Sequence, residues 1–224
     1  MISGTLNALW DSYGEAFRLH AHQLLAWAYN DVRTRLHPEL EEPDITGLLA
    51  EAIKFRLNHH PDTPDEYLHY WPGDQEPISP GGQLGNDRLR LDITIIRTGV
   101  RPRLSFIFEA KRLRTGGFPI GKYTGEGGMG DFIQCRYGEE HPEAAMVGLF
   151  QNKDAMYWQE ELRRVFREDQ TVAVSRLGIE KELHKVNILP SLPDEFRSVH
   201  KRTSGQYIDL YHVFLDCTDG AKSG

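Results

Sequence analysis

Cysteine is scarce in this chain, whose 224 residues include only Cys135 and Cys217. Neither stands in a Cys-x-x-Cys pair or at zinc-finger spacing from histidine, which argues against a disulfide framework and a structural zinc site. Long apolar runs are missing too, since no stretch approaches the roughly 20 residues that cross a bilayer. The first ten residues lack the charged-then-apolar layout of a secretory signal. We therefore expect a soluble cytoplasmic protein with no membrane partner.

Basic residues are not in excess either, because the formal net charge is −7. A protein that coats nucleic acid through its whole surface would be basic, so any contact with nucleic acid must be local. The glycines between residues 125 and 130 are not followed by Gly-Lys-Ser/Thr, which argues against a phosphate-binding P-loop. The ten histidines show neither His-Glu-x-x-His nor finger spacing, so a zinc or histidine-based nuclease site is not indicated.

Helical spacing of apolar residues is clear in several segments. It predicts helices at Leu6–Leu36, Ile45–Asn58, Asp131–Tyr137 and Asp154–Arg167. Asp44 or Thr46 is the expected N-cap of the second helix. Pro38 ends the first, because proline disfavours helical geometry in the residue before it.

Alternation of apolar and polar residues predicts the strands. Two of them, Arg88–Thr98 and Arg103–Leu113, are joined by a turn at Gly99–Pro102 and form an antiparallel hairpin. Further expected elements are an apolar strand at Ala145–Phe150, a late strand at Tyr207–Leu215 paired with Lys185–Leu189, a loop at His59–Asp87 with one short strand at Tyr67–Trp71, and a glycine-rich loop at Thr115–Gly130.

These elements place the chain in the α/β class, with a small mixed sheet flanked by helices. With 39% hydrophobic residues the chain can bury a sizeable core, and its length suits one domain with additions. We expect an N-terminal helical extension over 1–43, a core over 44–150, and a C-terminal helix and strand addition over 151–224.

Three charged residues of the predicted hairpin form the main functional candidate. Glu109 and Lys111 are two residues apart in one strand and project from the same face, and the hairpin can bring Asp92 opposite them. Such a cluster costs energy unless something binds it, and carboxylate oxygens with a backbone carbonyl suit Mg²⁺ or Mn²⁺. An ammonium beside a metal-bound water can orient that water or neutralise charge in the transition state. The pattern therefore favours metal-dependent hydrolysis of a phosphodiester.

At these residues, Arg90-Leu-Asp92-Ile-Thr and Phe108-Glu109-Ala-Lys111, the chain resembles the PD-(D/E)xK nuclease superfamily. The resemblance covers roughly Asp44 to Phe150 and implies a restriction-endonuclease-like core. It also implies metal ligation by Asp92 and Glu109, participation of the Ala110 carbonyl and catalytic assistance from Lys111. Many members add a glutamate from the helix before the hairpin, and Glu51 stands at that position.

Other parts of the chain are candidates for substrate contacts. The resemblance extends to a Gln and Tyr on the next helix, of which Gln134 and Tyr137 look like a variant with altered spacing. Lys122, Tyr123 and Arg136 flank the glycine-rich loop and would guide a nucleic-acid strand. A basic edge at Lys111, Arg112 and Arg114 is the best candidate for phosphate contact, and His200, Arg202 and His212 would reach the active face from the tail.

Simpler interpretations stay open for each feature. In the simpler interpretation of Asp92, Glu109 and Lys111, the three residues form an exposed set of cross-strand salt bridges. Such a set needs no metal and contributes about 1 kcal/mol or less to stability. Glu51 would be a solvated helix residue paired with Lys54. The glycine-rich segment would be an ordinary loop, the basic edge a solvated strand end, and the histidines surface or core residues.

The function expected from the resemblance is that of a Mg²⁺-dependent deoxyribonuclease acting in restriction, repair or anti-phage defence. DNA rather than RNA as the substrate follows from the resemblance alone. The alternatives are a catalytically silent nuclease-like binding or assembly subunit, and a defence nuclease that is active only with a partner protein. Assembly into a homodimer also stays open as an interpretation.

Overall fold

The computed structural model describes residues 2–78, 89–99, 101, 103–172, 175–192 and 194–218. Its helices are α1 (Ile2–Val32), the 3₁₀ turn η1 (Arg33–Arg35), α2 (Glu42–His59), the 3₁₀ turn η2 (Asp65–His69), α3 (Ile120–Thr124), α4 (Met129–Ile133) and α5 (Ala155–Thr171). Its strands are β1 (Tyr70–Ile78), β2 (Leu89–Arg97), β3 (Ser105–Leu113), β4 (Glu143–Phe150), β5 (Ile179–Lys185), β6 (Glu195–Lys201) and β7 (Tyr207–Asp216). None of the helices in this part of the chain combines the length and apolar character that crossing a bilayer requires.

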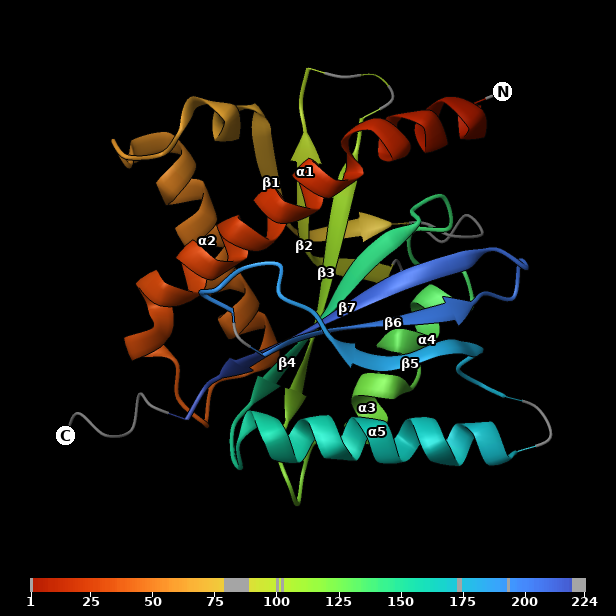
Figure 1. Ribbon diagram of the computed structural model, residues 1–224. Coiled ribbons are helices and arrows are strands. Elements are labelled where there is room, and N and C mark those ends of the chain that lie inside the picture. Colours follow the sequence, from red (N-terminus) through yellow and green to blue (C-terminus); the bar gives the residue numbers. More distant parts are fainter. Residues whose placement is uncertain are drawn as a thin grey trace.

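The seven strands form one mixed sheet in the order β1-β2-β3-β4-β7-β6-β5, with helices around it (Figure 1). The central strands β3, β4 and β7 are parallel, and the pairs toward both edges are antiparallel. A mixed sheet flanked by helices agrees with the predicted α/β class. The predicted antiparallel hairpin is present as β2 and β3.

Both faces of the sheet are covered by helices, and β4 shows this in its sequence. Its alternate residues Ala145, Val147 and Leu149 join a core that includes residues of α1 and α2. Ala144 and Met146 join a second core that includes residues of α3, α4 and α5. A strand buried on both faces reads as a continuous apolar run, which is why β4 was predictable from its sequence.

Strand β1 is longer than the predicted short strand at Tyr67–Trp71. It pairs with β2 over nearly its whole length, and Pro72 and Pro77 lie opposite Ile95 and Arg90. Both prolines are tolerated because β1 is an edge strand and proline cannot donate a ladder hydrogen bond. Residues 79–87 of the predicted loop at His59–Asp87 lie outside the described residues, as do residue 88 and residues 100 and 102 of the predicted turn.

The C-terminal part of the chain pairs differently from the prediction. Strand β7 lies in the middle of the sheet, parallel to β4 and antiparallel to β6. The predicted pairing with Lys185–Leu189 is wrong, because β5 ends at Lys185 and pairs with β6. Strand β6 was missed because three polar residues, Arg197, Ser198 and His200, interrupt its apolar pattern.

Polar side chains on one face of helix α1 bind it to strands β4, β6 and β7. Arg18 donates to Glu143 of β4 at 2.6 Å, and His22 Nδ1 lies 2.5 Å from Glu195 Oε1 of β6. The hydroxyl of Tyr29 donates to the carbonyl of Asp216 at 2.9 Å and accepts the N–H of the same residue at 3.1 Å. These contacts fix the helix across the sheet (Figure 1).

Replacing Tyr29 with phenylalanine is expected to lower the free energy of unfolding by about 1–2 kcal/mol, because one hydroxyl satisfies two backbone groups of β7. Urea unfolding at 25 °C measures the change. Tyr207→Phe is the matched control, since Tyr207 is exposed and its loss of a hydroxyl should cost less than about 0.5 kcal/mol. Equal unfolding midpoints for the two variants would contradict the role given to Tyr29.

Candidate active site

The site forms where β2 and β3 separate. Their ladder runs from the pair Ile96 and Ser105 to the pair Ile93 and Phe108 and stops there. Beyond this point β3 continues along β4, while β2 continues along β1. The side chain of Asp92 fills the first position after the ladder, because its Oδ2 accepts the N–H of Ala110 at 2.8 Å. A carboxylate thereby replaces a main-chain partner at the fork.

Asp92 is held from its other side by strand β1. Gln75 donates through Nε2 to Asp92 Oδ1 at 2.7 Å. Gln75 has a φ of 49°, the left-handed region that non-glycine residues rarely adopt. Both oxygens of Asp92 are therefore directed by neighbours, and the carboxylate has a fixed orientation at the fork.

The ammonium of Lys111 lies among the acidic groups. Its Nζ lies 2.6 Å from the Ala110 carbonyl oxygen, 2.8 Å from Glu109 Oε1, 2.9 Å from Glu42 Oε1 and 3.9 Å from Asp92 Oδ2. The structure thus brings the three predicted side chains, Asp92, Glu109 and Lys111, into one cluster with the Ala110 carbonyl. It adds Glu42, which sequence reasoning missed.

Burial dominates the electrostatics of the two strand carboxylates. The pKa of Glu109 is raised well above its usual value, first by desolvation and then by Asp92, and Lys111 opposes the rise. Desolvation also raises the pKa of Asp92, against the effect of Lys111 and of the Ala110 N–H. Desolvation alone would lower the pKa of Lys111, but Glu109, Glu42 and Asp92 outweigh it and raise the value. Three carboxylates face one ammonium, so the cluster favours an additional positive charge.

The atoms of the cluster suit a hard divalent cation. Asp92, Glu109 and the Ala110 carbonyl offer the oxygen ligands that Mg²⁺ and Mn²⁺ prefer. Glu109 Oε2 is buried and has no hydrogen-bond partner among the described residues, so one ligand atom is available. Within the same part of the chain, no three histidine, cysteine or acidic side chains are arranged as a metal site. A cation here would be held by two carboxylates, a carbonyl and water.

Glu51 is not part of this cluster, and Glu42 takes the place predicted for it. Glu51 is exposed and lines a surface hollow with Asp31 and Arg35, about two and a half turns further along α2. The reason is that α2 begins at Glu42 instead of Ile45, so its first turn reaches β3. Pro43 in that first turn was the available signal, because proline favours the first positions of a helix.

The predicted N-caps of α2 are also wrong. The N-cap position belongs to Glu41, which makes no side-chain capping bond. Asp44 lies inside the first turn, and Thr46 donates through Oγ1 to the carbonyl of Glu42 at 3.1 Å.

The residues predicted around the glycine-rich loop separate into different places. Tyr123 is fully buried, so its side chain cannot contact a nucleic-acid strand on the surface. Lys122 and Gln134 are exposed on the surface. Arg136 pairs with Asp131 at 2.5 Å. None of these contacts joins Asp92, Glu109 or Lys111 in the described structure.

Tyr137 is the member of this group that borders the cluster. Its hydroxyl donates to the Arg90 carbonyl at 3.4 Å, next to Asp92 in β2. Burial raises the pKa of Tyr137, and the charges of Glu109, Asp131 and Asp92 add to the rise. Tyr137 therefore stays a neutral hydroxyl beside the two strand carboxylates.

The C-terminal histidines lie in the core and do not reach the cluster. Ser198 Oγ lies 2.7 Å from His212 Nε2 and 2.6 Å from His200 Nε2, and the Tyr123 hydroxyl lies 2.9 Å from His212 Nδ1. Burial lowers the pKa of His200 to about 4 and that of His212 well below its usual value. Both rings are neutral, and the row ties β6 and β7 to α3. Arg202 is also buried and donates to the carbonyl of Glu139 at 2.6 Å.

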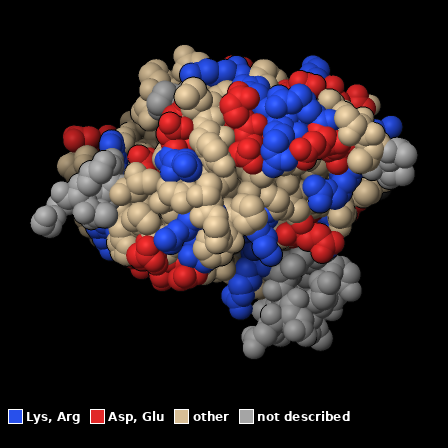
Figure 2. Space-filling model, turned by 90° about the horizontal axis from the view of Figure 1, so that it is seen from below, with Lys and Arg blue, Asp and Glu red and all other residues tan. Residues whose placement is uncertain are grey.

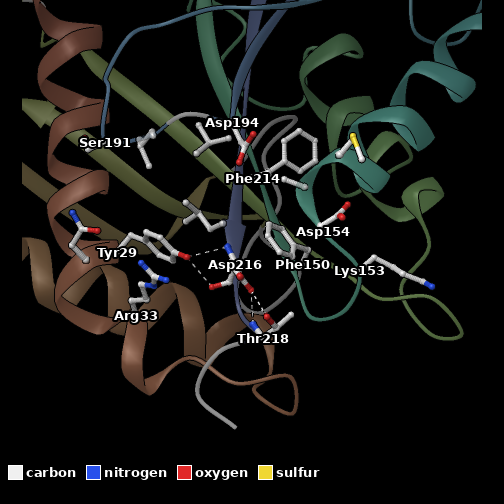
Figure 3. A pocket seen from close by; sticks show the side chains of 16 residues that line it. Tyr29, Arg33, Phe150, Lys153, Asp154, Ser191, Asp194, Phe214, Asp216 and Thr218 are labelled. Atoms are coloured by element: carbon white, nitrogen blue, oxygen red, sulfur yellow. Dashed lines mark hydrogen bonds between the residues drawn. The ribbon is translucent and has the colours of Figure 1, made fainter. Parts of the chain in front are cut away.

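A separate hollow of about 740 Å³ opens at the carboxyl ends of β4 and β7 (Figure 3). Two of its acidic groups have local partners: Asp216 accepts from the N–H and the hydroxyl of Thr218, and Asp154 accepts the N–H of Tyr157 at the start of α5. The residues that line it include no member of the Lys111 cluster. The hollow is thus distinct from the candidate active site.

Comparison with protein-family models, with curated proteins and with solved structures finds no match to this chain. A function for this protein must therefore be inferred from the geometry of the cluster.

Proposed function

We propose that this protein is a metal-dependent nuclease that hydrolyses phosphodiester bonds, with DNA as its substrate. The observation that carries the proposal is the pair of buried carboxylates, Asp92 and Glu109, beside Lys111 at a fork between two strands. Burying two acids and an amine has no evident structural benefit, because well-packed apolar residues would stabilise such a position at least as well. Buried acids with raised pKa values are typical of sites that bind a charged ligand.

Each residue of the cluster has a distinct role in the proposal. Asp92, Glu109 and the Ala110 carbonyl would hold Mg²⁺ or Mn²⁺. The ion would lower the pKa of a bound water and would stabilise charge on the phosphate. Lys111 would neutralise the phosphate oxygen that gains charge during attack. Glu42 positions the ammonium, since it binds Lys111 through Oε1 and the N–H of Arg112 through Oε2 at 3.1 Å.

The arrangement of elements supports a restriction-endonuclease-like core within the larger sheet. Helix α2 precedes β2 and β3, which carry the acids, and the parallel strand β4 follows. The likeness to the PD-(D/E)xK superfamily supports the proposal through the motif residues, now joined by an acid from the first turn of α2. DNA as the substrate is part of the proposal through this resemblance.

The test is a cleavage assay with single- and double-stranded DNA and RNA, in Mg²⁺, Mn²⁺ or EDTA. DNA cleavage with either ion and none in EDTA is the expected result. Either ion should also stabilise the wild-type fold by about 2–3 kcal/mol at a hundredfold excess over its Kd. Glu109→Gln should lose both effects, whereas Glu51→Gln should keep both, because Glu51 is exposed and far along α2.

The outcomes separate the proposal from its rivals. Nucleic-acid binding without cleavage, unchanged by Lys111→Ala, would indicate a silent binding subunit. Cleavage that starts only when a second protein is added would indicate a partner-activated nuclease. No response to either ion in cleavage or in thermal unfolding would overturn the metal site itself.

A further inference from the structure

A short acidic segment, residues 39–42, lies on a strip of basic side chains at the end of β3. We call Lys111, Arg112 and Arg114 the basic strip. Glu42 pairs with Lys111 at 2.9 Å, Glu41 with Arg112 at 2.5 Å and Glu39 with Arg114 at 3.3 Å. Each cation of the strip therefore has its own glutamate, two from the connection before α2 and one from the first residue of α2.

Main-chain oxygens of the same connection extend the match. Arg112 donates through Nη1 to the carbonyl of Leu40 at 3.3 Å, and Arg114 donates through Nη1 to the carbonyl of Pro38 at 3.3 Å. Each guanidinium thus meets a carboxylate and a carbonyl oxygen. A row of oxygen acceptors along an extended anionic chain is also what the phosphates of a nucleic-acid strand present to arginines.

The two sides of this contact are held very differently. The side chain of Arg112 is 12% exposed and lies 3.9 Å from the centre of the Phe118 ring, so its position is fixed. The side chains of Glu39 and Glu41 are 73% and 65% exposed. Exposed ion pairs contribute little free energy, so these two glutamate side chains can move away while Arg112 stays in place.

We infer that the basic strip is a binding surface for the phosphates of a nucleic-acid strand, and that the side chains of Glu39 and Glu41 are intramolecular competitors that cover it. This inference rests on the proposed nuclease function. The strip begins at Lys111, which also belongs to the carboxylate cluster.

The experiment measures the affinity of fluorescently labelled single- and double-stranded DNA by anisotropy, in EDTA so that metal-dependent cleavage does not contribute. In Glu39→Gln/Glu41→Gln both competing charges are removed, and Glu41 makes no capping side-chain bond that the change would break. We expect affinity to rise about fivefold, since each exposed pair contributes modestly. The dependence of log affinity on log salt should steepen by about 1–2, because each additional phosphate contact contributes about 0.7–0.9.

Glu161→Gln/Glu168→Gln is the matched control. It removes the same charge from two glutamates of α5 that pair with Arg164 at 2.9 and 2.6 Å. Basic and acidic side chains lie side by side over much of the face seen in Figure 2. Because the control removes the same charge as the test variant, a general effect of net charge would raise the affinity of both variants equally.

Adding Arg112→Gln and Arg114→Gln to the double variant should remove the gain, with thermal unfolding used to verify that the quadruple variant folds. Equal affinities for the test and control variants would overturn the inference, as would a gain that survives the loss of both arginines. If that quadruple variant does not fold, adding Arg114→Gln alone must remove part of the gain. A gain in affinity without cleavage by the wild type in any metal would support the surface and refute the nuclease. Cleavage without a gain would do the reverse.

Discussion

Asp92→Asn is expected to reduce metal-dependent cleavage about a thousandfold, because in the proposed mechanism it would remove a charged ligand from the ion that would activate water and stabilise the transition state. The substitution keeps the size of the side chain, and its oxygen can still accept the N–H of Ala110, as Asp92 Oδ2 does at 2.8 Å. Because burial raises the pKa of Asp92, we expect that loss of its negative charge does not destabilise the fold. The variant should therefore lose cleavage activity but keep the stability of the wild type.

Single-turnover cleavage with saturating Mn²⁺ measures the effect, and circular dichroism verifies the fold. Asp44→Asn is the matched control, because it makes the same chemical change at an exposed position in the first turn of α2. The control should retain wild-type activity. Asp92→Asn with more than a tenth of wild-type activity would refute the assignment of Asp92 as a metal ligand.

The hairpin and its cluster were predictable because the signals are local. Alternation fixes which residues of a strand share a face, so Glu109 and Lys111 had to project together. A turn near Gly99, whose φ is 83°, sets the register that brings Asp92 to the same place. The fork itself was not predictable, since it depends on β3 leaving β2 to pair with β4, which lies more than thirty residues later.

Glu42, strand β6 and the pairing of β7 were missed for different physical reasons. The apolar rows of α2 begin at Ile45, so periodicity places the start of the helix one turn too late and directs attention to Glu51. The position of β7 between β4 and β6 is set by packing between distant segments. Strand β6 was missed because its buried polar residues Ser198 and His200 satisfy one another inside that packing and interrupt the apolar pattern.

Lys111→Met is expected to destabilise the protein by about 3 kcal/mol at pH 8, because it leaves buried carboxylates without their cation. The ammonium is mostly buried and contacts Glu109, Glu42 and the Ala110 carbonyl within 2.9 Å. Methionine retains most of the side-chain volume, so the loss reflects charge. Cleavage should also disappear, since no other amine belongs to the cluster in the described residues.

The raised pKa values of the two carboxylates predict how the stability loss caused by Lys111→Met depends on pH. The folded protein holds the pKa values of Glu109 and Asp92 above their usual values, so their contribution to stability is full at low pH and is lost as pH rises through the raised values. Lys111 opposes both shifts, and removing it should raise these values further. The loss in free energy of unfolding caused by Lys111→Met should therefore be small at pH 5 and largest at pH 8, as measured by urea unfolding.

Divalent ions provide the complementary measurement. At pH 8, Mn²⁺ should stabilise Lys111→Met more than the wild type, because in the variant the ion supplies the only positive charge among the carboxylates. The rescued variant should still not cleave DNA, since the ion replaces the charge of Lys111 but not its contact with the phosphate. An equal deficit at pH 5 and pH 8, unaffected by Mn²⁺, would mean that Lys111 belongs to an ordinary solvated ion-pair set.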